Sequence, residues 1–295
     1  MSDTIRGLWV AIATPLDSEG RVDPVALARH GTWLLDQGCD GLVPFGTTGE
    51  GPSFTAAERL GAVEALLRAG IDAGRIAIGA GAPAIGDTVG LVREALALGL
   101  THALILPPFY FRDAPEDGLE DAFAAVIEGV ASDRLRATLY NIPQVSGVAV
   151  SPALLGRLRA RFGRTIAGVK DSTGNFDSFL ALRAGAPDCA VVVGHEPHIP
   201  RVLAAGGAGT ICGMANMVPG MVRALFTDPA AAEAMQAACD LLGGEMFQPA
   251  MKAVLAAQSG DAAWRAVRPP LRAASPATGA RIAAALAAMQ KRQAA

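Results

Sequence analysis

Short apolar runs recur along the chain, and each is followed by a stretch in which apolar residues have the spacing of a helix. Eight such runs begin near Leu8, Gly41, Ile76, His102, Leu135, Ile166, Ala190 and Gly209, at intervals of 19 to 35 residues. Their apolar residues are continuous rather than alternating, which is typical of strands covered on both faces. The pattern therefore predicts a parallel sheet that closes into a TIM (β/α)8 barrel rather than an open, doubly wound sheet.

Residues that favour the first turn of a helix stand between these runs, where helices are expected. The predicted helices cover residues 25–37 after Asp23 and Pro24, 59–68 after Thr55 and Glu58, 88–98 after Asp87, and a segment from Ser151 and Pro152 through residue 161. Thr55 and Glu58 have the spacing of a capping box, in which each side chain bonds the backbone amide of the other. These signals support alternating strands and helices.

The pattern changes after the eighth run, because helical spacing then continues with no strand between the helices. Helices are predicted over residues 221–226, 229–242, 247–257 and 278–293, and Pro269, Pro270 and Pro276 mark a break before the last one. We therefore expect a barrel over residues 1–224 that carries the active site, followed by an all-helical C-terminal region over residues 225–295.

Composition narrows the class of protein. Hydrophobic residues make up 51% of the 295 residues and charged residues 18%, which is ample for a large core in a globular chain. The net charge is −3 and no basic cluster stands out, so nucleic acid is not an expected partner. No apolar stretch is long enough to span a membrane, and the N-terminal segment lacks the basic region of a signal peptide.

Cysteine and histidine usage gives no sign of a metal site or cofactor. The four cysteines, Cys39, Cys189, Cys212 and Cys239, show no CxxC pairing. Scattered single cysteines of this kind are most often small buried hydrophobes in a reducing compartment, so a cytoplasmic location is predicted. A group of possible ligands occurs at His195, Glu196 and His198. No third ligand of the right type for a metal stands nearby, which favours substrate contact or a plain surface position over metal binding.

Unusual polar residues follow the predicted strands at the ends where a barrel of this type carries its active site. They lie in residues 46–50 (GTTGE) after the second strand, 107–111 after the fourth, at Tyr140 and Asn141 closing the fifth, at Lys170 closing the sixth, and in residues 194–198 after the seventh. Five separate loops therefore bring such residues to one end of the barrel.

Lys170 is the most informative of these residues. Of the 25 basic residues, only Lys170, Lys252 and Lys291 are lysines. Burial in an apolar strand disfavours the ammonium, and the neutral amine is the form that adds to a carbonyl to make a Schiff base. The alternative is a structural ion pair with the neighbouring Asp171. Lys252 and Lys291 fall on C-terminal helices, where a snorkelling or salt-bridging lysine is the ordinary case.

Both tyrosines of the chain, Tyr110 and Tyr140, lie in the loops at this end. A phenol can move the proton that imine formation and carbon–carbon cleavage require. Each could instead be a structural residue, with its hydroxyl on a backbone carbonyl.

The turn Gly46–Thr47–Thr48–Gly49–Glu50 offers two hydroxyls and backbone amides between glycines. That combination suits a bound carboxylate, although the threonines could simply cap a helix.

Together GTTGE, YNIP (residues 140–143) and GVKDSTG (residues 168–174) resemble the dihydrodipicolinate synthase and N-acetylneuraminate lyase superfamily. The resemblance implies a class I pyruvate-dependent aldolase in which Lys170 forms the Schiff base and Tyr140 shuttles protons. It also implies that Thr47 relays protons to that tyrosine, and that Thr48 and its turn bind the carboxylate of pyruvate.

Further roles are implied by the same resemblance. Tyr110 matches a tyrosine that enters the site from a neighbouring subunit, and Ile211 matches a position that lines the pocket. Family members are commonly tetramers built as dimers of dimers, so a homo-oligomer is expected.

One departure bears on the substrate. Dihydrodipicolinate synthases have an arginine two residues after the YNxP motif, which binds the carboxylate of aspartate semialdehyde, and Val145 stands at that place here. An apolar side chain cannot hold a carboxylate. The stretch from Tyr140 to Val148 looks more like lyases of sialic acid and 2-keto-3-deoxy sugar acids, but Glu196 and Pro197 depart from the sialic acid lyase pattern.

The sequence thus predicts a lyase that joins or cleaves pyruvate and an aldehyde through an imine on Lys170, acting on a 2-keto-3-deoxy sugar acid or a related 2-keto acid. The alternatives are 4-hydroxy-tetrahydrodipicolinate synthesis from pyruvate and aspartate semialdehyde, and dehydration of a 2-keto acid. In a different class, the chain could be a non-catalytic barrel that binds a keto acid.

Overall fold

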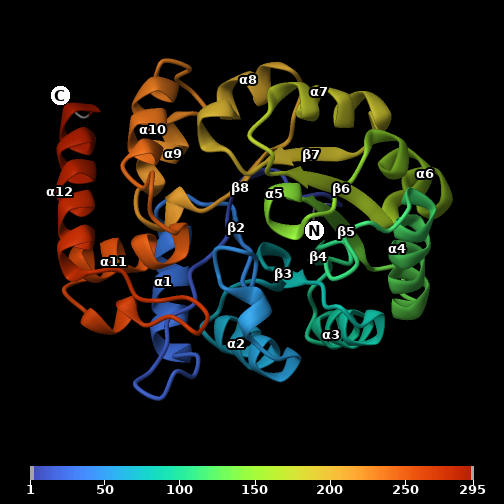
Figure 1. Cartoon of the computed structure of the whole chain (residues 1–295), viewed down its shortest axis with the longest axis horizontal. Coiled ribbons are helices and arrows are strands. Elements are labelled where there is room, and N and C mark those ends of the chain that lie inside the picture. The colour runs from blue at the N-terminus through green and yellow to red at the C-terminus, as the bar shows by residue number, and fades with distance from the viewer. Residues whose placement is uncertain (1–2, 294–295) are drawn as a thin grey trace.

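Eight parallel strands ring the centre of the molecule in a computed structural model that describes residues 3–293 (Figure 1). They are β1 (Gly7–Val10), β2 (Gly41–Leu42), β3 (Ala77–Ala80), β4 (His102–Ile105), β5 (Arg136–Asn141), β6 (Ile166–Asp171), β7 (Ala190–Val193) and β8 (Gly209–Cys212). The order around the sheet is β2-β1-β8-β7-β6-β5-β4-β3, and a parallel bridge between Leu42 and Ile76 joins the two ends. The predicted (β/α)8 barrel is confirmed.

Helices cover the outside of this ring (Figure 1). They are α1 (Pro24–Asp36), α2 (Ala56–Arg68), α3 (Ile85–Ala97), α4 (Glu116–Val130), α6 (Pro152–Phe162), α7 (Phe176–Gly185), α8 (Ile199–Ala204) and α9 (Pro219–Ala224). The short helix α5 (Pro143–Ser146) follows β5 directly and lies over the middle of the ring (Figure 1). The loops that leave the strands all lie at the carboxyl end of the barrel.

Side-chain hydrogen bonds confirm three of the four predicted helix starts. Asp23 accepts from two amides of α1, Thr55 and Glu58 form the predicted capping box, and Ser151 caps α6. The prediction that Asp87 caps a helix is wrong, because α3 begins before it and Asp87 lies inside the first turn. A carboxylate in the first turn interacts favourably with the helix dipole, so Asp87 indicates a helix start without being its cap.

Alternate residues of the strands serve two separate cores. Leu8 and Val10 of β1 pack in the large core between strands and helices, whereas Trp9 packs inside the barrel. The interior cluster also holds Ile211 of β8 and Tyr140 of β5. Successive strand residues point to opposite faces, so each strand divides its side chains between the two cores.

The C-terminal region is helical and packs on the barrel. It contains α10 (Ala231–Asp240), α11 (Phe247–Ser259), the short helix η6 (Ala262–Arg265) and α12 (Pro276–Gln293), with no strand in residues 225–293. These helices lie together beside α1, coloured orange to red in Figure 1. Met235, Val254 and Leu286 are buried in the same core as the barrel helices. Pro276 is the first residue of α12, so it opens this helix rather than belonging to the break before it.

Two further observations concern the predicted surroundings of the protein. No helix within residues 3–293 is long and apolar enough to cross a membrane. All four cysteines are free thiols, and Cys239 alone is partly exposed. The compartment stays a prediction.

His30 of α1 connects this helix to the carboxyl end of the barrel through Asn216. Asn216 Nδ2 donates to the carbonyls of Ala11 and Gly213 at 2.9 Å, so its Oδ1 faces His30 Nε2 at 3.1 Å. His30 Nε2 therefore donates, as it does in the neutral imidazole. Burial lowers the pKa of His30 from 6.5 to about 4, and the bond to Asn216 offsets only part of that effect.

This histidine should make the protein sensitive to acid. Between pH 6.5 and about 4, His30 is protonated in the unfolded chain but neutral in the folded protein. The free energy of unfolding therefore falls as the pH falls through this range. We expect His30→Gln, which keeps a donor toward Asn216, to flatten this dependence. Denaturant unfolding at several pH values in this window measures it. Equal slopes for the two proteins would contradict the prediction.

Candidate active site

The pairing of β5 with β6 brings the two predicted catalytic residues together. Tyr140 and Lys170 are register partners, and alternation turns both side chains into the barrel. Lys170 Nζ donates to Tyr140 Oη at 3.1 Å, and Nζ lies 4.3 Å from the centre of the phenol ring. Lys170 is 4% exposed and Tyr140 is 3% exposed. An amine and a phenol are thus in direct contact in an enclosed, largely apolar space.

Thr47 extends this contact toward solvent. Its Oγ1 lies 3.3 Å from Tyr140 Oη, which places hydroxyl, phenol and amine in one row. Burial disfavours the phenolate, but the charge of Lys170 and hydrogen bonds with Thr47, Lys170 and Ser172 outweigh it, so the pKa of Tyr140 is lower than usual. A phenol with these neighbours is suited to exchange protons with a group bound at the amine.

Asp171 has no contact with the neighbouring lysine. It points to the opposite face of β6, where Oδ1 accepts from Asn141 Nδ2 at 3.1 Å and Oδ2 accepts from the Thr173 hydroxyl at 3.1 Å. The hypothesis of a Lys170–Asp171 ion pair is therefore wrong, because adjacent strand residues face opposite sides. Asp171 instead fixes the loop that follows the strand.

The Gly46–Glu50 turn closes on itself beside this row. Glu50 N donates to Thr47 O at 3.1 Å, whereas the amides of Thr47, Thr48 and Gly49 donate no hydrogen bond within residues 3–293. Gly49 has no room for a side chain, since a Cβ would lie 2.8 Å from the carbonyl oxygen of Ile12. Neighbouring amides with no internal partner are the feature that a bound anion uses.

The remaining predicted residues lie around this centre in different environments. Ile211 is fully buried in the barrel interior. Glu196 is buried, and its Oε1 accepts from Gly213 N at 3.1 Å and from Met214 N at 2.9 Å, so a substrate contact would have to use the other oxygen. Tyr110 is 74% exposed on the surface of this chain. The roles predicted for these three residues stay predictions.

Within residues 3–293, the ring contacts of His195 and His198 are with each other and, for His198, with Phe176. The rings of His195 and His198 lie 4.6 Å apart, edge to face. No group of three or more His, Cys, Asp or Glu side chains in residues 3–293 is arranged to hold a metal ion.

A pocket of about 370 Å³ opens beside Thr47 along the loops after β4 and β5. Leu106 and Val145 give it apolar walls, and Arg112 also lines it. Arg112 packs so closely on the backbone that a Cβ on Gly147 would lie 2.8 Å from its Nε. No acidic side chain in the described residues pairs with Arg112. The pocket beside Thr47 therefore has a cation available at Arg112.

Gly194, at the end of β7, is a site residue whose importance the sequence pattern did not reveal. A Cβ there would collide with the Ser172 hydroxyl and lie 3.2 Å from Lys170 Cε. Glycine at position 194 thus leaves room for the Ser172 hydroxyl and for the lysine side chain that passes beside it. Glycine occurs in loops for many reasons, and at position 194 the reason is contact with side chains from β6 and the loop after it, which the local sequence does not reveal.

The sequence and structure were compared with known proteins. A model of the dihydrodipicolinate synthetase family matches residues 4–288. An uncharacterized DapA-like lyase of Chloroflexus aurantiacus is 36% identical over 274 residues, covering 90% of this chain and 91% of that protein. A 4-hydroxy-tetrahydrodipicolinate synthase of Anaeromyxobacter is 35% identical over 217 residues, covering 73% and 71%.

The fold is similar to those of solved structures. Dihydrodipicolinate synthase from Agrobacterium tumefaciens superposes with a TM-score of 0.91 at 35% identity, covering 97% of this chain and 99% of that one. A variant of the Sulfolobus solfataricus 2-keto-3-deoxygluconate aldolase has a TM-score of 0.83 at 20% identity, a likeness of fold alone.

A (β/α)8 barrel with a buried lysine against a tyrosine at its carboxyl end has the design of a Schiff-base-forming lyase. The chain belongs to the dihydrodipicolinate synthetase family. Members of that family are class I lyases that use pyruvate, and this protein is a lyase of that class.

The fit of Lys170 against Gly194 can be tested by adding one methyl group. In Gly194→Ala the new methyl group collides with the Ser172 hydroxyl, which bonds Tyr140, and Lys170 must shift by a few tenths of an ångström. We therefore expect the rate to fall, by less than the roughly 100-fold that a 1 Å displacement at a reacting group costs. Steady-state kinetics with pyruvate and an accepted aldehyde measures the loss. Gly220→Ala is the matched control, because a Cβ there meets no atom within 4 Å. Full activity of the first variant would show that Lys170 does not need this space.

Proposed function

We propose that the protein joins or cleaves the carbon–carbon bond between pyruvate and an aldehyde through a Schiff base on Lys170. The larger substrate or product is a 2-keto-3-deoxy sugar acid or a related 2-keto acid. The observation that supports this most directly is the buried 3.1 Å contact between the amine of Lys170 and the phenol of Tyr140. A keto-acid binder would need neither group in this contact.

The proposed chemistry follows from the row of three polar groups. The neutral amine of Lys170 adds to the keto carbon of pyruvate, and Tyr140 donates the proton with which the carbinolamine hydroxyl leaves as water. Loss of a methyl proton from the imine gives an enamine, which attacks the aldehyde carbon in the direction of synthesis. Thr47 passes protons between Tyr140 and the pocket.

The carboxylate of pyruvate binds, in this proposal, at the Gly46–Glu50 turn. The Thr48 hydroxyl and the unpartnered amides of the turn provide donors for a carboxylate beside the row of Thr47, Tyr140 and Lys170. Binding the carboxylate there would hold the keto carbon toward the amine.

We further propose that the protein is a homo-oligomer, a tetramer built as a dimer of dimers. Tyr110 and Phe111 are adjacent aromatic residues that are both about three-quarters exposed, at 74% and 73%. Burial of this pair against a second copy would remove an apolar surface from water and bring Tyr110 to a neighbouring site.

Reductive trapping tests the nucleophile. With pyruvate and borohydride, we expect one reduced three-carbon adduct on Lys170 and none on Lys252, as read by peptide mass spectrometry. Lys170→Ala should lose both the adduct and turnover while keeping its circular dichroism spectrum. An unmodified Lys170 would overturn the assignment of the Schiff base to this lysine.

A second candidate function is supported by Arg112. Val145 cannot bind the carboxylate of aspartate semialdehyde, but Arg112 lines the same pocket and has no acidic partner in the described residues. A guanidinium donates two parallel hydrogen bonds to a carboxylate. The protein could therefore condense pyruvate with aspartate semialdehyde while using a cation from a different loop.

An aldehyde panel separates the two candidates. With pyruvate, the first expects faster turnover of sugar-derived aldehydes such as N-acetylmannosamine, and the second expects faster turnover of aspartate semialdehyde. In the second case Arg112→Ala should raise the KM for the semialdehyde roughly tenfold or more, the usual loss for a bond to a charged group. Arg93→Ala, on the exposed face of α3, is the control. Turnover of a 2-keto acid without any aldehyde would instead indicate a dehydratase.

A further inference from the structure

A second buried lysine, Lys252, lies in the C-terminal region. Lys252 of α11 contacts Glu50 at 2.6 Å between Nζ and Oε1, and both side chains are 0% exposed. The prediction that Lys252 is an ordinary salt-bridging lysine is correct as to the salt bridge, but the amine does not reach solvent. Burying two charges is expensive, and apolar residues of similar volume often give equal or greater stability. Stability alone therefore does not explain this pair.

Glu50 is the last residue of the turn that carries Thr47 and Thr48. Its backbone is left-handed, with φ 57° and ψ 30°, a conformation that is unfavourable for a residue other than glycine. Its side chain is held at both oxygens, Oε1 by Lys252 and Oε2 by the backbone amide of Arg268 at 3.1 Å. The strained end of the turn is thus anchored from the C-terminal region.

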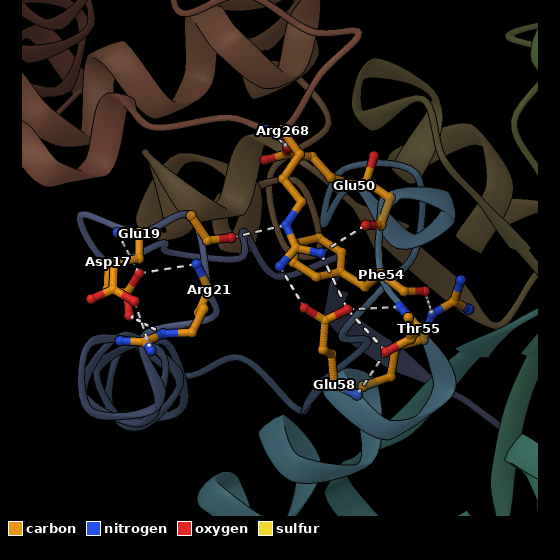
Figure 2. A network of polar contacts seen from close by, with 11 residues as sticks. Asp17, Glu19, Arg21, Glu50, Phe54, Thr55, Glu58 and Arg268 are labelled. Atoms are coloured by element: carbon orange, nitrogen blue, oxygen red, sulfur yellow. Dashed lines mark hydrogen bonds and ion pairs between the residues drawn. The ribbon is translucent and has the colours of Figure 1, made fainter.

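Arg268 anchors the segment that follows the turn. Its guanidinium donates to the carbonyl of Ser53 at 2.8 Å and to the Glu58 carboxylate, and it lies 4.2 Å from the centre of the Phe54 ring (Figure 2). Its Nε also donates to the carbonyl of Gly20 at 2.9 Å. One residue therefore connects the C-terminal region to the loop after β1, to the start of α2 and to Glu50.

A third connection reaches the active-site row itself. Gln248, one turn before Lys252 on α11, donates from Nε2 to the carbonyl of Thr47 at 3.2 Å. Thr47 is the residue whose hydroxyl contacts Tyr140. Both ends of the turn are therefore held by residues about 200 positions later in the chain.

We propose that Gln248, Lys252 and Arg268 are positioning residues for the proposed reaction, and that the C-terminal region completes the active site by aiming the Gly46–Glu50 turn. The inference rests on the proposed function, in which this turn holds the carboxylate of pyruvate. Displacing the turn moves the donors away from the carboxylate and Thr47 away from Tyr140. The consequence is weaker binding of pyruvate before any loss of fold.

The test measures the pyruvate concentration that gives half-maximal borohydride trapping at Lys170. Gln248→Ala removes the bond to Thr47, and the double variant Glu50→Gln with Lys252→Met removes both buried charges together. We expect each to raise that concentration roughly tenfold or more while the melting temperature stays near that of the wild type. Gln258→Ala is the matched control, since this side chain also lies on α11 and donates one bond at 3.2 Å, but to Met217.

Each outcome decides between the possibilities. An unchanged half-maximal concentration in Gln248→Ala and in the folded double variant would overturn the inference, even if their melting temperatures fell, because that is the result of a purely structural role. If the double variant does not fold, Gln248→Ala compared with Gln258→Ala decides alone. Absence of any adduct in the wild type would overturn the proposed function, and this inference with it.

Discussion

The register between β5 and β6 is the constraint on which the rest of the site depends. It sets Tyr140 opposite Lys170 and turns both into the barrel interior. A shift of β6 by one residue would turn Lys170 outward, away from Tyr140, and would send Asp171 into an apolar space without its hydrogen-bond partners. The contact of Thr47 with Tyr140 and the space at Gly194 meet the lysine only while this register holds.

The second requirement is a turn of fixed shape beside that pair. The barrel alone does not supply it, because the turn ends in a left-handed glutamate whose carboxylate is bound by Lys252 and Arg268. The barrel and the C-terminal helices therefore differ in the order of their strands and helices, but they are not separate structural units. The two parts share a hydrophobic core, and the hydrogen bonds of the turn cross the boundary between them. The C-terminal region, which follows the barrel in the sequence, is thus in direct contact with the Gly46–Glu50 turn.

The distribution of charge in the pocket explains why the family does not name the second substrate. In the proposed function, a lysine, a tyrosine and backbone amides hold pyruvate, which many lyases of this kind can share. The pocket beside Thr47 has apolar walls at Leu106 and Val145, and Arg112 lines it without an acidic partner in the described residues. Such a surface suits a carboxylate or a sugar hydroxyl, since a guanidinium donates to either. If the second substrate binds there, as we propose, these side chains and not the imine chemistry select it.

Local signals suffice to predict the barrel, its eight strands and the lysine and tyrosine at their ends, because continuous apolar runs and capping residues involve only neighbouring positions. The helices that follow the barrel without strands are predictable in the same way. Three features became apparent only from the fold: Asp171 faces away from Lys170, Gly194 leaves room beside that lysine, and Lys252 is buried against Glu50. Each of these depends on contacts between segments far apart in the chain, and a local pattern carries no record of which distant side chain will lie opposite.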